Sequence, residues 1–340
     1  MARNDSARAW TARLLTSITR TSAFAWPVVA FLLSLGSNSA RPESPEAELD
    51  LGSVRLSLAR VPATLTCRMG ESFPDAHTDA RELPAHDVRI TKIRWAGRYE
   101  VTNTEFAAFL NAAEGASGRT RVESQDYGVQ RWYDDSLGSA EIHNVPPRWT
   151  VDSAGEHVPH VRKEAAAWRP EGGSERRPVT GVSWFGANAF CAWVSQRTGR
   201  RVRLPTEAEW ECLCRAGTTT RFWYGNEPSQ DRMNASGVGG ADRFDPFSQS
   251  GRRAPVGSFP PNPWGLYDTH GNVWEWTRDV WYRRYTPAAV EDPIETGPGP
   301  HRIYRGGAYE RYGWACRSAA RRSGAPSRMT EDLGFRVVVE

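Results

Sequence analysis

The chain of 340 residues contains almost no lysine. Lys92 and Lys163 are its only lysines, so arginine supplies every other cation. The formal net charge of +3 is accounted for by the first twenty residues, and the remainder is formally neutral. Nucleic-acid binding needs a clustered basic face, whereas the arginine pairs further along are short and lie beside acidic residues. The sequence therefore predicts no nucleic-acid partner.

Long apolar runs are also scarce, and the single one lies near the N-terminus. An arginine-bearing start leads into the apolar run Ala23–Leu35, and small residues at Gly36–Ala40 precede Arg41. This order is typical of a secretory signal peptide, and the run is shorter than the ~20 residues of a membrane span. An uncleaved N-terminal membrane anchor is the alternative. Either way, we expect segment 1–40 to direct the domain outside the cytoplasm, where the protein is secreted or periplasmic, and we expect no membrane span in the mature domain.

Cysteine is sparse, and no CxxC motif or zinc-ligand spacing occurs. The five cysteines are Cys67, Cys191, Cys212, Cys214 and Cys316. An oxidising compartment permits disulfides, but an odd count leaves at least one thiol unpaired within the monomer. Cys212 and Cys214 lie two residues apart on a predicted helix, so their sulfur atoms diverge and cannot pair with each other.

The composition predicts one globular domain after a linker. Apolar residues make up 39% and charged residues 24% of the chain, which excludes a disordered or fibrous protein. Residues 41–60 carry Pro, Glu and Ser and are predicted to form the linker. The domain is predicted to span 61–340. A polar, turn-rich segment at about 115–177 is interpreted as an insertion within it, with a hairpin over 148–161.

Three helices are predicted from their capping residues. Thr102–Glu105 and Thr206–Glu209 are capping boxes, each followed by a helical pattern of apolar residues. Ser183 caps a third helix, which Gly199 terminates, and Gly217 is predicted to end the helix that begins near Thr206.

Beyond residue 218 the helical periodicity vanishes. Short aromatic segments and Gly-Pro-Asn turns continue to a closing strand, Phe335–Val339, and the whole chain contains 15 Trp. A few helices packed on irregular, aromatic-rich β structure predict an α+β fold rather than a parallel-sheet fold.

Four motifs occur in a characteristic order. They are Glu100–Asn103; Pro178–Trp184 with Arg203–Glu211; Gly265–Trp276; and Tyr304–Gly307 with Cys316–Arg321 and Leu333–Arg336. Together they resemble the sulfatase-modifying-factor, or formylglycine-generating-enzyme-like, family from about residue 69 to the end. The resemblance implies a fold related to C-type lectins, with little regular structure and bound calcium.

The resemblance also implies a first calcium site. Its ligands are the side chains of Asp268 and Glu275 and the carbonyl groups of Gly271 and Val273. Two carboxylates around a glycine-containing turn suit calcium independently of the family, because calcium prefers hard oxygen ligands. The alternative is a tight turn in which Glu275 is solvated or paired with an arginine. His270, in the same turn, is interpreted as a hydrogen-bonding turn residue.

A second calcium site of the family corresponds to the side chains of Asn234 and Asp245 and the carbonyl groups of Ala235 and Phe247. The spacing after Phe247 departs from the family pattern. The resemblance therefore implies this site less directly than the first.

The catalytic pattern of the family's oxidase is incomplete in this chain. After the glycine pair, the oxidase carries a serine and then two cysteines that bind copper(I), the metal that activates oxygen. Here the serine position is Ala308, the segment is shorter, and Cys316 is its single thiol. Because copper(I) requires soft ligands and one thiol cannot form a two-thiolate site, we do not expect copper.

Cys316 also has a structural interpretation. In the oxidase, a cysteine at the position of Cys214 forms a disulfide to the closing segment, where this chain carries Ser318. Cys316 lies two residues earlier and on a strand faces the same side. A Cys214–Cys316 disulfide is therefore the structural alternative for both residues.

Two functions remain open. The first is a calcium-stabilised binding or accessory module without formylglycine oxidase activity, recognising a peptide, carbohydrate or small molecule. The second is a divergent metal-dependent oxidoreductase that modifies a protein or a secondary metabolite. Aromatic faces beside guanidinium groups suit sugars, peptides or anions. The predicted pocket residues are Trp274, Trp276, Tyr309, Arg311, Tyr312, Trp314, Arg317 and Arg321.

Overall fold

The computed structural model describes most of the predicted domain. It covers residues 46–117, 120–124, 130–134, 140–145, 161–165, 167–237, 252–282 and 284–340. All of these fall within one folded unit, Ser44–Glu340. The predicted signal segment and most of the predicted hairpin over 148–161 lie outside the described residues. Within the described part, no helix is long and apolar enough to cross a membrane.

The three predicted helices are confirmed. They are α1 (Asn103–Ser117), α2 (Trp184–Thr198) and α3 (Glu207–Arg215).

Their caps are the predicted ones. The Thr102 N–H donates to Glu105 Oε2 at 2.7 Å, and the Glu105 N–H donates back to Thr102 Oγ1 at 3.3 Å. Thr206 and Glu209 form the same reciprocal box at α3. The end of α3 differs slightly from the prediction, because Ala216 rather than Gly217 adopts the left-handed conformation at its C-cap.

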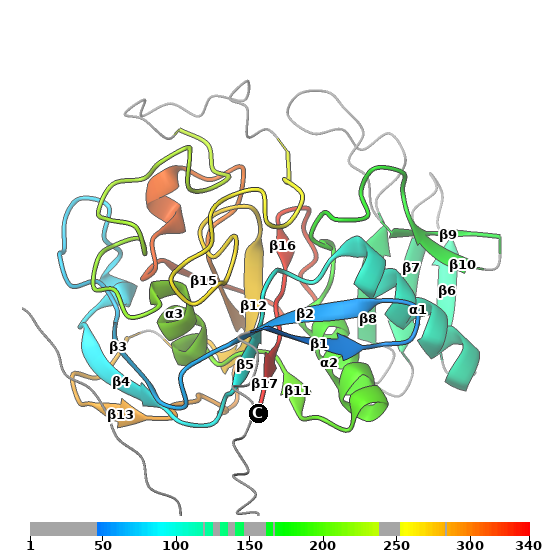
Figure 1. The fold of residues 1–340 in the computed structure, drawn as a ribbon, viewed down its shortest axis with the longest axis horizontal. Helices are drawn as coiled ribbons and strands as arrows, with labels where there is room; N and C mark the ends of the chain where they lie inside the picture. The colour runs from blue at the N-terminus through cyan, green and yellow to red at the C-terminus, as the bar shows by residue number, and fades with distance from the viewer. Residues whose placement is uncertain are drawn as a thin grey trace, which may run out of the picture. The chain divides into compact units, whose positions relative to one another are not determined.

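The strands form five small sheets, which Figure 1 shows around α3 and beside α1 and α2. A five-stranded sheet has the order β1-β2-β5-β17-β11, and a four-stranded sheet has the order β15-β14-β12-β16. The others are β13-β4-β3, β6-β7-β8 and β10-β9. The strands are β1 (Glu46–Asp50), β2 (Arg55–Arg60), β3 (Leu65–Met69), β4 (His86–Ile90), β5 (Trp95–Gly97), β6 (Thr120–Ser124), β7 (Gln130–Asp134), β8 (Ala140–Val145), β9 (Val161–Glu164), β10 (Ala167–Pro170), β11 (Val202–Arg203), β12 (Trp274–Val280), β13 (Val290–Glu291), β14 (Arg302–Arg305), β15 (Arg321–Gly324), β16 (Leu333–Gly334) and β17 (Val338–Val339).

The predicted linker over 41–60 is wrong for most of its length. Residues 46–60 contain β1 and β2, which pair as an antiparallel hairpin at the edge of the five-stranded sheet. Leu56 and Leu58 are buried in the core on either side of the half-buried Ser57, and Arg55 before them is exposed. This period of two is the strand signal that the polar composition of the segment obscured.

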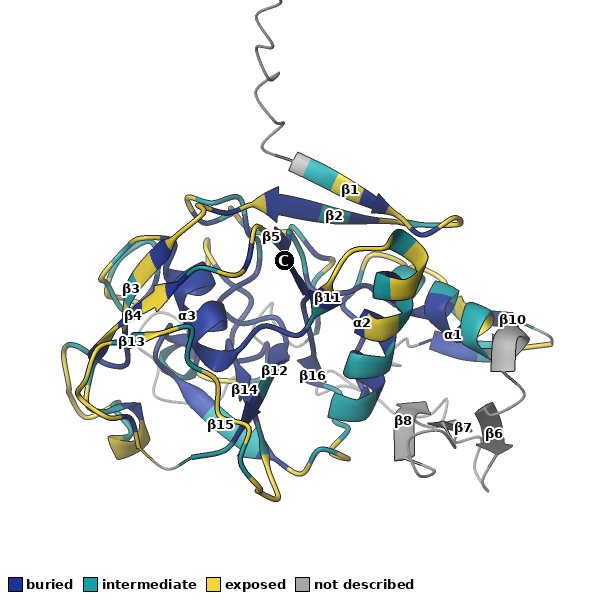
Figure 2. Ribbon diagram, turned by 90° about the horizontal axis from the view of Figure 1, so that it is seen from below, coloured by how far each residue is buried: buried dark blue, intermediate teal, exposed yellow. Residues whose placement is uncertain are grey.

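The main core lies between the sheets and helices α1 and α2. Phe106, Phe109, Phe190 and Phe335 pack edge-to-face or stacked at centroid separations of 5.3–6.2 Å. Helix α3 is buried along its whole length, including its charged side chains, and Figure 2 shows it coloured as buried throughout. The architecture is α+β, as predicted.

Candidate functional site

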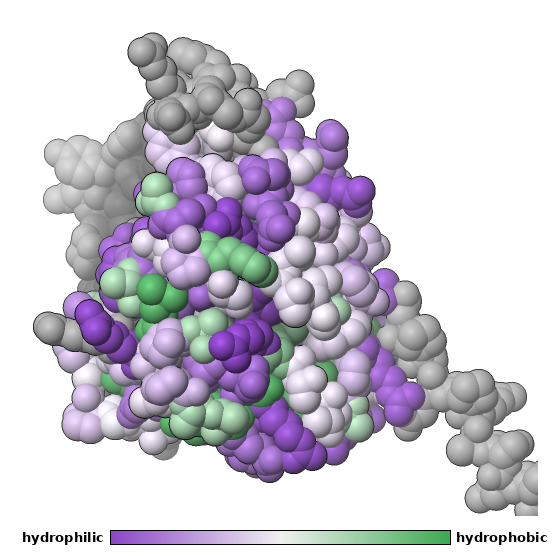
Figure 3. Space-filling view, turned by 90° about the vertical axis from the view of Figure 1, so that its left-hand side faces the viewer, coloured by the Kyte–Doolittle hydropathy of each residue, from purple (hydrophilic) through white to green (hydrophobic). Residues whose placement is uncertain are grey.

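A cavity of about 630 Å³ opens at one end of the described structure. Its walls come from the loop Ala76–Asp79, the turn Glu227–Pro228 and residues between Tyr312 and Arg322. Figure 3 views the side of the molecule on which β3 and β4 lie, where polar residues surround small, separate apolar patches.

One wall of the cavity is aromatic. The rings of His77 and Trp314 stack with centroids 4.4 Å apart and planes inclined by 4°. The Arg221 guanidinium group lies 5.6 Å from the Trp314 ring centroid. Tyr312, at the same wall, is 42% exposed. A flat or partly apolar group of a ligand can pack against this wall, because aromatic faces and edges both offer contact area.

The base of the cavity is held by a buried charge network. Arg317 Nη1 donates to Glu71 Oε2 and to Glu82 Oε2, each at 2.7 Å, and Nη2 donates to the His77 carbonyl at 2.6 Å. Burial raises the pKa of Glu82, and the hydrogen bond from Arg317 opposes this shift. Arg317 therefore fixes the loop that carries His77, and its own donors are already occupied.

Three of the eight predicted pocket residues line the cavity: Tyr312, Trp314 and Arg317. Arg311 does not line it; its side chain is exposed and bound to Asp332 at 2.8 Å. The remaining four do not line it and are buried in the interior: Trp274, Trp276, Tyr309 and Arg321. Trp274 and Trp276 are buried because both faces of β12 are covered.

The segment after the glycine pair encloses the thiol of Cys316. Gly306 and Gly307 both have positive φ angles, 99° and 78°, which favour glycine. A Cβ atom on Gly307 would lie 2.3 Å from Cys316 Sγ, so the sulfur packs directly on the glycine backbone. Burial raises the pKa of the Cys316 thiol to about 12. The thiol is therefore protonated near neutral pH and covered.

The predicted Cys214–Cys316 disulfide is wrong. The bond joins Cys67 on β3 to Cys212 on α3, and Cys214 and Cys316 are free and buried. Cys212 faces β3, whereas Cys214, two positions further along the helix, points to the opposite side, toward His270 and Ser318. The predicted divergence of the two helical sulfur atoms is confirmed, but the partner of Cys212 was not predicted.

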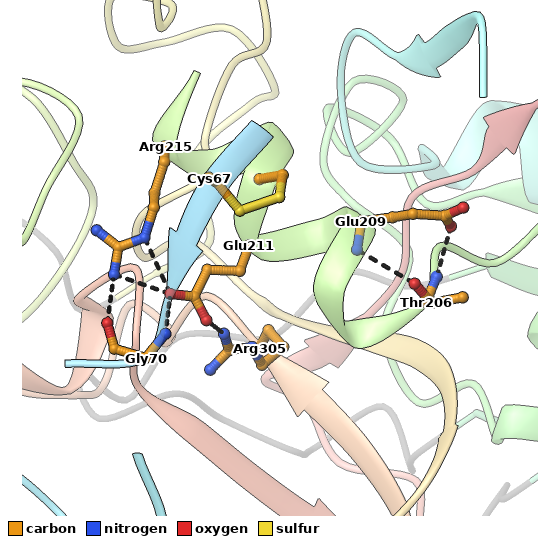
Figure 4. The surroundings of a disulfide bond; sticks show 8 residues. Cys67, Gly70, Thr206, Glu209, Glu211, Arg215 and Arg305 are labelled. Carbon is orange, nitrogen blue, oxygen red and sulfur yellow. Dashed lines mark hydrogen bonds and ion pairs between the residues drawn. A yellow bond between two sulfur atoms is a disulfide. The ribbon is translucent and has the colours of Figure 1, made fainter. Parts of the chain in front are cut away.

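Figure 4 shows the disulfide beside a buried ion cluster on α3. Glu211 Oε1 accepts hydrogen bonds from the Gly70 N–H at 2.8 Å and from Arg215 Nε at 2.9 Å, and its other oxygen binds Arg305. The opposing charges of Arg215 and Arg305 lower the pKa of Glu211 against the effect of its burial. The disulfide and this cluster together attach β3 to the buried helix.

His270 is a hydrogen-bonding turn residue, as interpreted from the sequence. Its Nδ1 lies 2.7 Å from the Cys316 carbonyl oxygen, to which it donates, and its Nε2 accepts from the Trp223 N–H at 3.1 Å. Burial lowers the pKa of His270 to about 4, so the ring is neutral. Both nitrogen atoms are used in joining three chain segments.

Glu275 is paired with an arginine, which is the alternative to calcium binding that the sequence left open. Its two oxygen atoms accept from Arg336 at 2.6 and 2.7 Å, and Oε2 also accepts from Trp210 Nε1 at 2.7 Å. This buried ion pair fully occupies the carboxylate.

Asp268 and Glu100 instead each leave one oxygen unsatisfied. Asp268 Oδ2 accepts from the Gly257 N–H at 2.7 Å, while Oδ1 is buried without a hydrogen-bond partner. Glu100 Oε1 accepts from Asn272 Nδ2 at 3.0 Å, while Oε2 is buried without one. Burial raises the pKa of Asp268 to about 6. Burial, followed by the charge of Asp268, raises the pKa of Glu100 well above its usual value. Sequence reasoning missed Glu100 as a candidate ligand, although it lies in the first of the four motifs.

The second predicted calcium site is described only in part. Asn234 is buried, and its Nδ2 donates to the Arg252 carbonyl at 2.8 Å and to Asn272 Oδ1 at 3.1 Å. Ala235 is also buried, while Asp245 and Phe247 lie outside the described residues. Among the described residues, no three His, Cys, Asp or Glu side chains cluster closely enough to hold a metal ion by themselves.

The chain matches the sulfatase-modifying factor enzyme 1-like domain over residues 55–340. The formylglycine-generating enzyme of Streptomyces coelicolor is 34% identical over 287 residues, which cover 79% of this chain and 84% of that enzyme. The mouse formylglycine-generating enzyme is 32% identical over 291 residues, covering 80% of this chain and 72% of that enzyme. A second mouse protein, the inactive C-alpha-formylglycine-generating enzyme 2, is 30% identical over 285 residues, covering 79% of this chain and 81% of that protein.

Solved structures show the same fold. PvdO from Pseudomonas aeruginosa superposes with a TM-score of 0.61 at 26% identity, covering 88% of this chain and 99% of that one. Treponema denticola variable protein 1 superposes with a TM-score of 0.57 at 19% identity, covering 86% of this chain and 98% of that one.

Proposed function

This chain belongs to the sulfatase-modifying factor enzyme 1-like family, and from that premise we propose that it is a binding or accessory protein without formylglycine oxidase activity. The environment of Cys316 is the observation that carries the proposal. The thiol is fully buried against Gly307, its pKa is raised to about 12, and no second cysteine follows the glycine pair.

The chemistry of copper(I) supports this proposal. Copper(I) needs soft thiolate ligands, and a buried thiol with a raised pKa loses its proton reluctantly. Cys214 lies beside the turn that carries His270, with its sulfur atom 3.7 Å from His270 Nε2. Burial raises the pKa of the Cys214 thiol as well, to about 11. Arg311, on the segment that follows the glycine pair, carries a permanent positive charge, which disfavours a second cation nearby.

The cavity beside His77 and Trp314 is the proposed binding site. Its stacked rings offer contact area for a sugar ring, a peptide side chain or another small molecule. Asp79 supplies a carboxylate whose pKa is lowered to about 2, first by its hydrogen bond with Arg81, so the group is ionised. Glu227 supplies a second carboxylate at the rim. Aromatic area with a few oriented polar groups is typical of a small-ligand site.

Calcium is proposed as a structural ligand of the domain. The unsatisfied oxygens Glu100 Oε2 and Asp268 Oδ1 fit a hard cation, because two buried carboxylates that repel each other are relieved by a positive charge. Backbone carbonyl groups of the turn, those of Gly271 and Val273, would complete the ligand set that the family implies. Bound calcium would neutralise this buried negative charge. Glu275 is not part of this proposed ligand set, because its two oxygens already accept three hydrogen bonds from Arg336 and Trp210.

We further propose that the domain works outside the cytoplasm. The leader-like segment 1–40 supports this, and so does the Cys67–Cys212 disulfide, since such bonds persist mainly in oxidising compartments. Mass spectrometry of the protein from its native host should show an N-terminus near Arg41. A full-length cytoplasmic product would contradict the proposal.

The oxidase assay tests the central claim. A sulfatase-type peptide containing a cysteine is incubated with the protein, copper, a reductant and oxygen, with the Streptomyces coelicolor enzyme as the positive control. Mass spectrometry should detect no conversion of the thiol to an aldehyde by this protein. Turnover that disappears in Cys316→Ser would make Cys316 a metal ligand. Turnover that persists in that variant but needs copper would place the metal elsewhere. Either result would favour the divergent oxidoreductase.

A further inference from the structure

The outer face of β14 and β15 carries half-buried arginine side chains around the buried Tyr304. Tyr304 pairs with Arg322 and Arg302 pairs with Gly324 in the antiparallel ladder. Paired residues point to the same face, so Arg302, Tyr304 and Arg322 lie on one side. The intervening residues Arg305 and Arg321 are completely buried on the other side. Figure 2 shows the two strands adjacent at one end of the structure.

Two further arginines approach Tyr304 from other segments. The Arg328 guanidinium group lies 6.0 Å from the Tyr304 ring centroid, and its side chain crosses Gly324, where a Cβ atom would lie 2.7 Å from Arg328 Cδ. Arg311 binds Asp332, whose carbonyl accepts from the Trp274 N–H at 2.7 Å. The Trp274 ring packs on Tyr304 at 5.3 Å.

The titration of Tyr304 is consistent with this arrangement. Burial raises the pKa of Tyr304, while the charges of Arg328, Arg322 and Arg311 each act to lower it. The three guanidinium groups are therefore within electrostatic reach of one phenol. We call Arg302, Arg311, Arg322 and Arg328 the arginine face.

Arg302 completes the arginine face. Its guanidinium group lies 4.3 Å from the Trp184 ring centroid, and its Nε atom is buried without a hydrogen-bond partner. The Trp184 N–H donates to the Pro326 carbonyl at 2.9 Å, which joins this tryptophan to the turn that carries Arg328. An unsatisfied buried donor favours a ligand that can accept its hydrogen bond.

Positive charge exceeds negative charge on the arginine face. Asp332 compensates Arg311, the charge of Asp279 acts on Arg302, and Asp79 lies 3.9 Å from Arg322 but is bound closely by Arg81. Among the described residues, neither Arg302 nor Arg328 forms an ion pair. The carboxylates therefore compensate the four guanidinium groups only in part, and a bound anion would complete the compensation.

We propose that the arginine face binds a small ligand through a tetrahedral oxyanion, a phosphate or sulfate group. Guanidinium forks match such groups in geometry, and the several acceptor oxygens of one oxyanion can satisfy more than one fork. The arginine face adjoins the cavity, since Arg322 also lines it. The inference goes beyond the proposed function and is independent of the oxidase assay, because it concerns the charge of the ligand rather than any chemistry.

Calorimetric titration with inorganic phosphate and with inorganic sulfate tests this inference, at an ionic strength held constant with chloride. Phenyl phosphate and phenyl sulfate then show which oxyanion a larger ligand carries. The wild type should bind at least one of the four probes saturably. Arg328→Gln should raise the Kd about tenfold, the loss expected for a charge-assisted hydrogen bond. Arg302→Gln with Arg328→Gln should abolish binding.

Arg55→Gln is the matched control, because Arg55 is an exposed arginine on β2, paired with Glu48. It should bind the anions as the wild type does. Circular dichroism should show that all variants are folded, since Arg328 is exposed and Arg302 is only half-buried. Absence of saturable binding by all four probes would overturn the inference, and so would equal Kd values in the wild type and the double variant.

Discussion

The sulfur atom of Cys214 lies 3.7 Å from the hydroxyl oxygen of Ser318. The family resemblance implies that these two positions are joined by a disulfide in the oxidase. Here the two side chains are in contact, with a serine hydroxyl group in place of a second sulfur atom. Its actual disulfide, Cys67–Cys212, instead ties the neighbouring position of the same helix to β3.

Ser318→Cys should consequently form a disulfide with Cys214. The closed loop spans 104 residues, and such a bridge is expected to stabilise the fold by about 2–4 kcal/mol. Thiol alkylation of the unfolded, unreduced protein, followed by mass spectrometry, should find one reactive thiol fewer than in the wild type. The missing thiol is that of Cys214, which the new disulfide protects. Ser318→Ala is the control and should keep Cys214 free. A reactive Cys214 in the Ser318→Cys variant would show that the two side chains do not approach closely enough.

Asp268→Asn should separate calcium binding from the structural role of the turn. Calcium should raise the melting temperature of the wild type, because a ligand that binds only the folded state stabilises it. The asparagine variant should lose that increase, while remaining folded, since asparagine tolerates the positive φ angle of 56° at this position. An equal response to calcium in both proteins would exclude Asp268 as a ligand.

Glu275→Gln should behave differently from Asp268→Asn. It should lower stability by about 3–5 kcal/mol with or without calcium, because it leaves Arg336 buried without its counter-charge. Urea unfolding in calcium and in chelator measures both effects. A variant that loses only its calcium response would return Glu275 to the ligand set.

The features that the sequence predicted are those set by neighbouring residues. The capping boxes at Thr102 and Thr206 depend on side chains three positions apart, so their pattern survives any tertiary arrangement. The α+β class follows from the same local signals. The β1–β2 hairpin was missed because the polar residues of 41–60 outweighed a short alternation around Leu56 and Leu58.

The features that the sequence did not predict depend on distant partners. Glu275 and Asp268 have the spacing of a shared cation site. In the folded protein, however, Glu275 is paired with Arg336 from the closing segment. Cys214 could not be assigned because its neighbours His270 and Ser318 come from separate segments. The cavity wall formed by His77 likewise comes from a loop outside all four motifs. Only the folded chain brings these groups together.

Arg317→Met should lower the free energy of unfolding far more than Arg311→Met. Arg317 is buried between Glu71 and Glu82, so its removal leaves Glu82 without its bound counter-charge and Glu71 with only Arg221, 3.8 Å away, at a cost of about 3–5 kcal/mol. Arg311 is 46% exposed beside Asp332, and loss of such a pair costs about 1 kcal/mol or less. Urea unfolding compares the two variants. Similar losses in both would mean that the Glu71–Arg317–Glu82 network is not the support of the cavity.

Asp279 should make the fold less stable as the pH rises toward neutrality. Its oxygens accept from the Glu207 N–H at 2.7 Å and the Glu295 N–H at 3.0 Å, at the start of α3. Burial, followed by the charge of Glu207, raises the pKa of Asp279 to about 7 from an ordinary value of 3.8. Between these two values the unfolded state has released the proton that the folded state retains, so its contribution to stability is lost as pH increases. Asp279→Asn removes this one titration and should reduce the slope of the stability profile, measured by urea unfolding between about pH 5 and pH 8; Glu105 and Asp268, whose pKa values burial raises to about 7 and about 6, continue to titrate there. Asp292→Asn is the control, because hydrogen bonds from Thr91 lower the pKa of Asp292 against its burial, and the group is ionised in both states across this range. An unchanged slope in Asp279→Asn would show that the proton is held elsewhere.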